Sequence, residues 1–354
     1  MHTVSTSLNA ARCGRSTAEL GTDRASSPKS FRARFVLLLA FICDSMAHGH
    51  TATATHIATS RRSKQAAAGE AIPKWALITG ASSGIGRELA IQAAETGYSV
   101  IITARNHANL DALALQIRRD HDVLVKVVPC DLSHQHASFK LDRATAGLDV
   151  RLLVLNAGYA YFGRFETQSA AAAAQMLSVN VGAAVSLSQV FVPRLLDGRD
   201  GYVLILGSAS AAVVGVPNVT LYAATKAFLR SFAAGMRAEL RGSGVSVTCA
   251  LPSAVETGFA SRGGLEQASV FSLPFLRRIG GVVLSPETVA RRCIRATLAR
   301  RAEVVPGVFP KMYVWLTDCR LLPMPIARGV AAFAFGTSPL LRVRGGGGGG
   351  GGGG

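Results

Sequence analysis

Tyr222 and Lys226 are the residues whose types and spacing point most directly to chemistry. They stand four residues apart at the start of a helical pattern over 222–241, so their side chains share one helix face about one turn apart. A tyrosine with a pKa near ~10 is a poor acid or base at neutral pH, but a nearby ammonium and a positively charged cofactor favour the phenolate. The pair therefore predicts proton transfer to or from a substrate oxygen.

A glycine-rich segment upstream predicts an anion site. The residues Thr79-Gly80-Ala81-Ser82-Ser83-Gly84-Ile85-Gly86 follow the apolar run 75–78 and open a helical pattern over 87–96. Glycines let the backbone approach a diphosphate closely, and the N-terminus of a helix stabilises its negative charge. We expect this loop to bind a dinucleotide through Gly80, Ser82, Ser83, Gly84, Ile85 and Gly86.

The end of the second predicted strand indicates which dinucleotide is bound. An acidic residue there would bind a ribose 2′-hydroxyl, whereas an arginine accommodates a 2′-phosphate. The chain has Thr103-Ala104-Arg105-Asn106-His107, without an acid. We therefore predict NADP(H), with Arg105 as the phosphate ligand.

The elements that must position these residues alternate between strands and helices. Short apolar runs are expected to be strands at 75–79, 99–104, 123–129, 152–155, 202–206, 245–250 and 302–305. Helical patterns over 87–96, 109–120, 170–196 and 222–241 lie between them. This order predicts an α/β fold: one doubly wound, Rossmann-like parallel sheet with helices on both faces. The segment 255–285, which contains five glycines and one proline, is expected to be a loop that lies over the site as a lid.

The composition changes at both ends of this domain. Residues 1–72 are predicted to be a disordered extension, 73–310 the nucleotide-binding domain, 311–344 an apolar and basic extension, and 345–354 a poly-glycine tail. The apolar run 35–43, followed by small residues, suits the core of a signal peptide, and 48–69 resembles a transit peptide. These segments suggest an organelle (plastid or mitochondrion) or the endoplasmic reticulum; a disordered extension without a targeting role is the alternative.

The net charge of +17 does not indicate a nucleic-acid partner. Residues 1–74 carry +6 and residues 276–354 carry +9, whereas residues 75–275 carry only +2. The central domain is thus nearly neutral, and no interleaving of aromatic and basic residues accompanies the charge. The six cysteines are scattered without a Cys-x-x-Cys pair, so no metal site is predicted.

Four motifs together resemble the short-chain dehydrogenase/reductase family. They are the glycine loop, Asn156-Ala157-Gly158, Ser208, and Tyr222-x-x-x-Lys226, and the match covers about residues 74–310. The resemblance implies that Ser208 binds the substrate carbonyl oxygen, Tyr222 passes the proton, Lys226 holds the nicotinamide ribose, and Asn180 supports a water in a proton relay. It also implies further contacts to the cofactor from Asp131, Leu132, Asn156, Ala157, Gly158, Pro252, Val255 and Thr257.

The chain departs from the family pattern at two places. The serine usually precedes the tyrosine by thirteen residues, but Ala209 stands there, so that Ser208 and Ser210 are both candidates. Ser208 fits the end of the preceding strand better. The family usually has Pro-Gly after the sixth strand, where this chain has Pro252-Ser253. The loop that carries Thr257 therefore departs from the family pattern.

These observations predict an NADPH-dependent carbonyl reductase. Apolar residues in the predicted lid (Val270, Phe271, Leu273, Phe275, Leu276) and in 312–335 suggest a lipophilic ketone, such as a ketoacyl, ketosphingoid or steroid compound. The segment 312–335 is too interrupted to span a membrane, so it would lie on the surface, form part of the lid, or contact an anionic membrane. The resemblance also implies a possible homo-oligomer. The alternative function is an NADP-binding scaffold or regulator without turnover.

Overall fold

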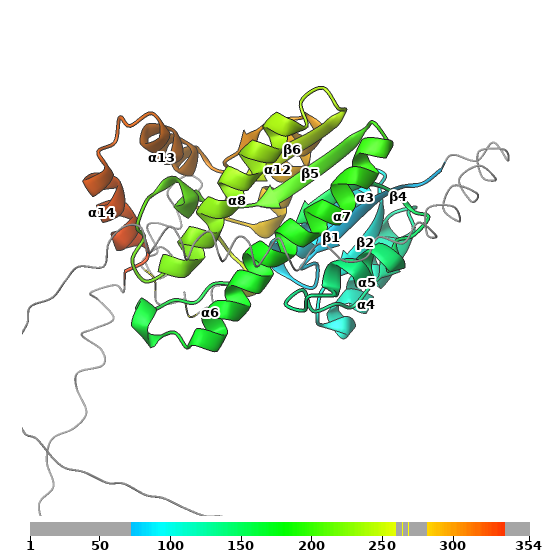
Figure 1. Cartoon of the computed structure of the whole chain (residues 1–354), viewed down its shortest axis with the longest axis horizontal. Coiled ribbons are helices and arrows are strands. Elements are labelled where there is room, and N and C mark those ends of the chain that lie inside the picture. Colours follow the sequence, from blue (N-terminus) through cyan, green and yellow to red (C-terminus); the bar gives the residue numbers. More distant parts are fainter. Residues whose placement is uncertain (1–71, 260–263, 265–267, 269–281, 337–354) are drawn as a thin grey trace, which may run out of the picture. The chain divides into compact units, whose positions relative to one another are not determined.

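The computed structural model describes residues 72–259, 264, 268 and 282–336. Within these ranges, seven parallel strands form one sheet in the order β3-β2-β1-β4-β5-β6-β9 (Figure 1). This arrangement confirms the predicted doubly wound α/β fold. The strands are β1 (Lys74–Thr79), β2 (Ser99–Thr103), β3 (Val125–Val127), β4 (Asp149–Leu155), β5 (Gly201–Leu206), β6 (Val245–Ala250) and β9 (Glu303–Val304).

The strands are buried on both faces because helices cover the sheet on both sides. Alternate strand residues enter two separate apolar clusters, with Leu77 in one and Ala76 and Ile78 in the other. The first cluster includes residues of α5 (Ala137–Ala144), α7 (Ala183–Asp197) and α8 (Thr220–Glu239). The second includes residues of α3 (Gly84–Glu95), α4 (His107–Asp120) and α12 (Pro286–Leu298).

Several element boundaries differ from the sequence predictions. The helix α3 begins at Gly84, inside the glycine loop, and β3 covers only three of the seven residues predicted. The helix α4 begins at His107 because the Asn106 side chain accepts a hydrogen bond from the Asn109 N–H at 3.0 Å and caps it. Local caps and turns of this kind decide the ends of elements.

The long helix predicted for 170–196 has three parts. It consists of α6 (Ala170–Leu177), a π-helical turn η2 (Ser178–Gly182) and α7. The run Ala170–Asp197 is long and apolar enough to cross a membrane by length and composition. Its second half packs against β4, β5 and α5, so these properties are those of a helix that covers a sheet.

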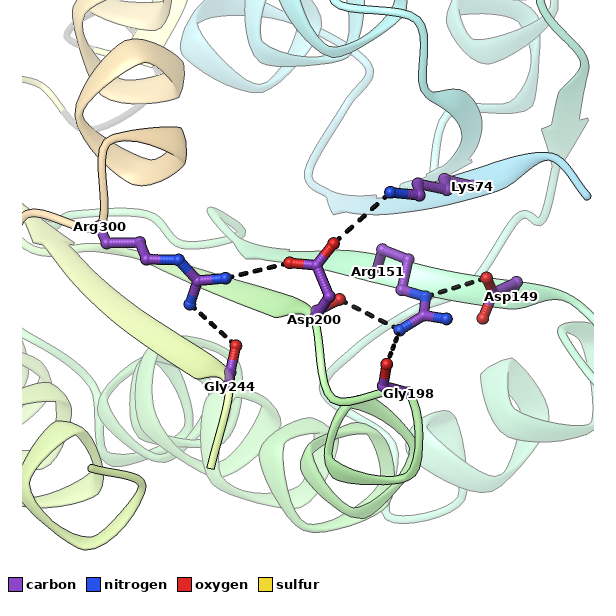
Figure 2. Close-up of polar contacts among 7 residues, drawn as sticks. All are labelled: Lys74, Asp149, Arg151, Gly198, Asp200, Gly244 and Arg300. Carbon is purple, nitrogen blue, oxygen red and sulfur yellow. Dashed lines mark hydrogen bonds and ion pairs between the residues drawn. The ribbon is translucent and has the colours of Figure 1, made fainter. Parts of the chain in front are cut away.

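A polar network fastens the edge of the sheet where the strands begin (Figure 2). The Arg151 guanidinium donates to the Asp149 carboxylate at 2.9 Å and to the Gly198 and Asp200 carbonyl oxygens. The Asp200 carboxylate in turn accepts from Arg300 at 3.0 Å. The network links the starts of β4 and β5 to the end of α12, and leaves the opposite edge for a ligand.

Two helices follow the last strand: α13 (Val308–Asp318) and α14 (Met324–Ala334) (Figure 1). The Tyr313 hydroxyl of α13 donates to the Ala327 carbonyl oxygen of α14 at 2.9 Å. The Arg328 guanidinium donates to the Val214 carbonyl oxygen at 2.8 Å, in the loop before α8. The region predicted to be surface-lying or lid-forming therefore contains a helical pair that is attached to the domain.

The remaining described elements are short. They are the 3₁₀ turns η1 (Phe165–Thr167) and η3 (Ala209–Ala212) and the two-stranded pair β7 (Ala254–Val255) and β8 (Val283–Leu284). The predictions for most of the lid, for the N-terminal extension before Ile72 and for the poly-glycine tail lie outside the described residues.

Candidate active site

The predicted nucleotide cleft lies where the strand order reverses, between β1 and β4. The Thr79 hydroxyl donates to the Val154 carbonyl oxygen at 3.0 Å and accepts from the backbone N–H groups of Asn156 and Ala157 at 2.9 and 3.1 Å. One side chain thus fixes the spacing of the two strand ends. Open parallel sheets bind their ligands at this type of switch point.

The glycine loop has a geometry that only glycine permits. Gly80 has a φ of +68°, and a Cβ there would lie 2.9 Å from Asn156 Nδ2. A Cβ on Gly86 would lie 2.2 Å from the Gly80 carbonyl oxygen, so the start of α3 packs directly on the loop. The Asn156 amide donates to the Thr79 carbonyl oxygen at 2.8 Å and holds the loop from the β4 side.

This loop fits a diphosphate on chemical grounds. It leads directly into α3, and the first turn of α3 carries no acidic side chain. The backbone N–H groups and the positive end of the helix dipole are therefore suited to an anion. Ser82, Ser83, Gly84 and Ile85 are half-buried at this helix start.

The residues predicted to favour NADP(H) over NAD(H) and to contact the cofactor nearby lie after the ends of β2 and β3. Arg105 is exposed directly after β2. Burial acts to raise the pKa of the Asp131 carboxyl, but hydrogen bonds from Ser133 and the charge of Arg105 lower that pKa overall. Arg105 and Asp131 are thus electrostatically coupled, and Leu132, the residue after Asp131, is buried.

The two candidate serines contact one another. The Ser208 hydroxyl accepts hydrogen bonds from the Ser210 backbone N–H at 3.2 Å and from the Ser210 hydroxyl at 3.0 Å. The Ala209 N–H donates to the Pro252 carbonyl oxygen at 2.9 Å, which ties this turn to the end of β6. Ser208 also acts on Tyr222, because a side-chain hydrogen bond from Ser208 works to lower the pKa of the Tyr222 hydroxyl, and Ser210 has no such effect.

Tyr222 is a weaker acid than the sequence suggested. Burial raises the pKa of its hydroxyl to about 12, and the hydrogen bond with Ser208 opposes this rise. The Lys226 ammonium donates to the Leu206 carbonyl oxygen at 2.7 Å and lies 5.7 Å from the centre of the Tyr222 ring. Burial therefore sets the direction of this shift in the protein alone, and Ser208, not Lys226, is the group that opposes it.

Asn180 lies within the π-helical turn and is 1% exposed. Its side-chain oxygen accepts from the Tyr159 N–H at 3.0 Å, and its amide donates to the Tyr159 carbonyl oxygen at 2.9 Å and to the Thr225 hydroxyl at 3.1 Å. A Cβ on Gly158 would lie 3.0 Å from the Asn180 oxygen and 3.7 Å from the Lys226 nitrogen. The structure thus brings Asn180, Gly158 and Lys226 together.

The loop after β6 is held in place despite its Pro-Ser sequence. The Ser253 hydroxyl donates to the Val282 carbonyl oxygen at 2.7 Å, and Val255 pairs with Leu284 in the small second sheet. The Thr257 side chain lies 3.0 Å from the position of a Cβ on Gly84. Thr257 thus faces the glycine loop, and the predicted contacts of Pro252, Val255 and Thr257 to the cofactor stay predictions.

Sequence reasoning missed two contributors to the site. The Thr225 hydroxyl donates to the Tyr222 carbonyl oxygen at 2.7 Å and links it to Asn180. The Phe259 ring packs against the Tyr222 ring with centres 5.8 Å apart. Thr225 lies between Tyr222 and Lys226, so its position in the motif was a signal for a role in the site. No spacing in the sequence connects Phe259 with Tyr222.

Comparisons with known proteins agree with this geometry. Residues 74–267 match the family model described as short chain dehydrogenase. The chain is 30% identical over 188 residues to very-long-chain 3-oxoacyl-CoA reductase-B of Danio rerio, which covers 52% of this chain and 60% of that one. It is 28% identical over 200 residues to the very-long-chain 3-oxoacyl-CoA reductase of Homo sapiens, 55% of this chain and 64% of that one. The chain thus spans about 60% of the length of these curated relatives.

Solved structures show the same relationship. A short-chain dehydrogenase from Sphingobium yanoikuyae in complex with NADPH has a TM-score of 0.62 and 27% identity, and the match covers 71% of this chain and 92% of that one. An alcohol dehydrogenase from the archaeon Thermococcus sibiricus, complexed with 5-hydroxy-NADP, has a TM-score of 0.57 and 27% identity, with 67% and 97% covered. The family model matches more than half of the chain, and the chain therefore belongs to the short-chain dehydrogenase family.

Proposed function

We propose that this protein is an NADPH-dependent carbonyl reductase that acts on a lipophilic ketone of the 3-oxoacyl type. The observation that carries the proposal is the meeting of Tyr222, Lys226 and Asn180 at the carboxyl ends of the strands. The Lys226 nitrogen lies 5.7 Å from the centre of the Tyr222 ring, Gly158 joins Lys226 to Asn180, and Ser208 influences the pKa of Tyr222. Proton donor, carbonyl ligand and nucleotide loop then border one cleft. This is the arrangement that reduction of a carbonyl group requires.

The choice of NADP(H) is supported by the end of β2. Arg105 is exposed there, and its positively charged guanidinium is suited to bind a 2′-phosphate. The Sphingobium yanoikuyae and Thermococcus sibiricus structures, whose names include NADPH and 5-hydroxy-NADP, agree with this choice. Gly80, Gly84, Gly86 and Asn156 would hold the diphosphate and the adjoining ribose, and Lys226 the nicotinamide ribose.

The residues have complementary roles in the proposed reaction. NADPH, when bound, supplies the hydride that reaches the carbonyl carbon. Because its pKa is about 12, the Tyr222 hydroxyl keeps its proton at neutral pH and can donate it to the ketone oxygen. The Ser208 hydroxyl binds that oxygen and orients it toward Tyr222. Asn180 orders the Tyr159 backbone and, through Thr225, the backbone of Tyr222.

The ammonium of Lys226 assists return of the proton. Burial lowers its pKa to about 8, so it is mostly charged at neutral pH but is close to its titration range. A buried cation near the Tyr222 ring stabilises the phenolate that forms after donation. Reprotonation of Tyr222 would then pass along the Asn180 side of the site.

A lipophilic substrate is supported by the apolar surroundings of Tyr222. Its ring packs with a cluster of small and branched residues that includes Ala160, Val213, Val216 and Val219. The curated relatives are named for very-long-chain 3-oxoacyl-CoA substrates. Together these observations favour a 3-oxoacyl compound with an extended hydrocarbon chain over a small polar ketone.

The test is NADPH consumption by the purified protein with 3-oxoacyl-CoA compounds of increasing chain length, compared with ketosphingoid bases, steroids and small ketones. We expect turnover that increases with chain length, prefers NADPH to NADH, and is lost in Tyr222→Phe. Ser208→Ala is expected to lose most of the activity and Ser210→Ala much less. A protein that binds NADPH tightly but consumes none with any compound would favour the scaffold alternative.

The predicted homo-oligomer and the predicted organelle address remain predictions. The address rests on residues before Ile72, which the structure does not describe.

A further inference from the structure

Exposed apolar side chains gather on the last two helices. Of the large hydrophobic residues that are exposed in the described part of the chain, about half lie between residues 308 and 333. Surface patches of this kind mark sites of interaction when they are contiguous. The residues are Val308, Phe309, Met312, Trp315, Leu321, Ile326, Val330 and Phe333.

The helix α14 is apolar on two sides. Ala327 and Ala331 face the domain and are buried, whereas Ile326, Val330 and Phe333 are about half exposed. The exposed residues are spaced by four and three positions, so they form one stripe along the outside of the helix. An apolar helix face is normally covered by apolar material, and the outer stripe of α14 has no such cover among the described residues.

The helix α13 has the same organisation. Val314 and Thr317 face inward and are buried, whereas Val308, Met312 and Trp315 form an exposed stripe with the same spacing. Trp315 is 56% exposed. An exposed tryptophan is typical of the boundary between water and lipid, where its ring meets both.

The charges of this region suit an anionic surface. Asp318 is the only acidic residue between Val308 and Gly336, and the Arg230 guanidinium of α8 binds its carboxylate at 2.9 Å. Lys311, Arg320 and Arg328 are exposed beside the stripes. A second copy of the chain would bring these like charges together, whereas anionic lipid headgroups would neutralise them.

The length of the helices decides how they would meet a bilayer. Each has 11 residues, so each extends about 16 Å, about half of the hydrocarbon core. They are too short to span and are suited to lie in the interface with one face buried.

From these observations we propose that α13 and α14 form a docking surface for an anionic lipid bilayer. The same helices are part of the wall beside the site, since Tyr313 and Ala327 pack in the apolar cluster around Tyr222. A bilayer bound here would lie beside the proposed substrate pocket, where a hydrocarbon chain could pass from lipid to protein. Binding itself does not depend on turnover, so a Tyr222→Phe protein is expected to bind equally well.

The test is co-sedimentation of the full chain with sucrose-loaded vesicles of phosphatidylcholine alone or with 30% phosphatidylserine, taken as roughly the content of an anionic leaflet. The variant carries Trp315→Glu, Ile326→Glu and Phe333→Glu. The matched control carries Leu124→Glu and Phe139→Glu. These two residues are exposed to a similar extent but lie outside α13 and α14. We expect the phosphatidylserine vesicles to bind the wild type, high salt to weaken binding, and the variant to lose about tenfold or more in partition coefficient while the control does not.

Three results would overturn the proposal. One is vesicle binding that the variant retains. Another is binding that the control loses to the same extent. The third is a wild-type protein that does not bind vesicles and has a larger hydrodynamic radius in light scattering than the variant. The exposed stripes would then join two copies of the chain. NADPH binding and the thermal midpoint, measured for each protein, show whether the variant has remained folded.

Discussion

The buried ammonium of Lys226 should leave a signature in the stability of the protein. Lys226 is 5% exposed, and burial lowers the pKa of its amine from 10.5 to about 8, with an opposing effect from Cys249. In the unfolded chain the amine keeps its proton up to about pH 10.5. Between these pH values the unfolded state binds more protons than the folded state, so the free energy of unfolding rises with pH.

The size of this effect follows from the two pKa values. Their difference corresponds to about 3 kcal/mol, which the folded protein loses at pH 7 and recovers by about pH 10.5. Lys226→Met removes the titration but also the hydrogen bond to the Leu206 carbonyl oxygen, which costs roughly 1–3 kcal/mol at every pH. The variant should therefore be about as stable as the wild type at pH 7 and clearly less stable near pH 10.

Guanidinium unfolding of both proteins without NADP(H), from pH 7 to pH 10, measures this difference. Tyrosines that ionise at high pH affect both proteins alike and cancel when the curves are subtracted. Lys126→Met serves as the control because Lys126 is exposed on β3, and its curve should follow that of the wild type. Parallel curves for the wild type and Lys226→Met would refute the account of a desolvated ammonium.

Three further substitutions test the packing of the glycine loop, of α8 and of the attachment of α13. Gly86→Ala should cost about 3 kcal/mol and abolish NADPH binding, because the added Cβ would lie 2.2 Å from a backbone oxygen. Gly235→Ala in α8, where a Cβ meets nothing within 4 Å, should instead stabilise by about 0.5–1 kcal/mol; equal thermal midpoints for the two variants would contradict this reasoning. Arg230→Met should cost about 2 kcal/mol in urea unfolding, because the Glu303 and Asp318 carboxylates would lose their shared partner. If the urea midpoint of Arg230→Met equals that of the wild type, the contacts of Arg230 with Glu303 and Asp318 do not stabilise the attachment of α13.

The sequence was sufficient for the fold because its signals are local and repeated. Most of the strands lie in short apolar runs, and the glycine loop reveals where the first strand gives way to a helix. The contacts of Asn156 with the loop could be expected once both motifs were recognised. Their positions follow from the rule that parallel strands end at the same edge.

Other features depend on contacts that sequence spacing does not encode. The pKa of Tyr222 is set by burial among residues from several elements, and its neighbour Phe259 lies 37 positions away along the chain. The helices α13 and α14 were read as an interrupted apolar segment, because Pro323 and Pro325 break the run. Those prolines stand at the start of α14, where a missing N–H costs nothing, so they separate two helices instead of preventing them.

The π-helical turn at Ser178–Gly182 makes the site sensitive to the number of residues in its helix. Each residue of an α-helix turns the chain by roughly 100°, so one extra residue rotates everything that follows relative to what precedes it. Removing one residue from this turn would restore a regular helix. Either the Asn180 amide would then rotate away from Tyr159 or α6 would shift around its own axis. Asn180 is therefore aligned by an insertion in the backbone, and we expect a single-residue deletion in this turn to displace it while every side chain discussed here remains present.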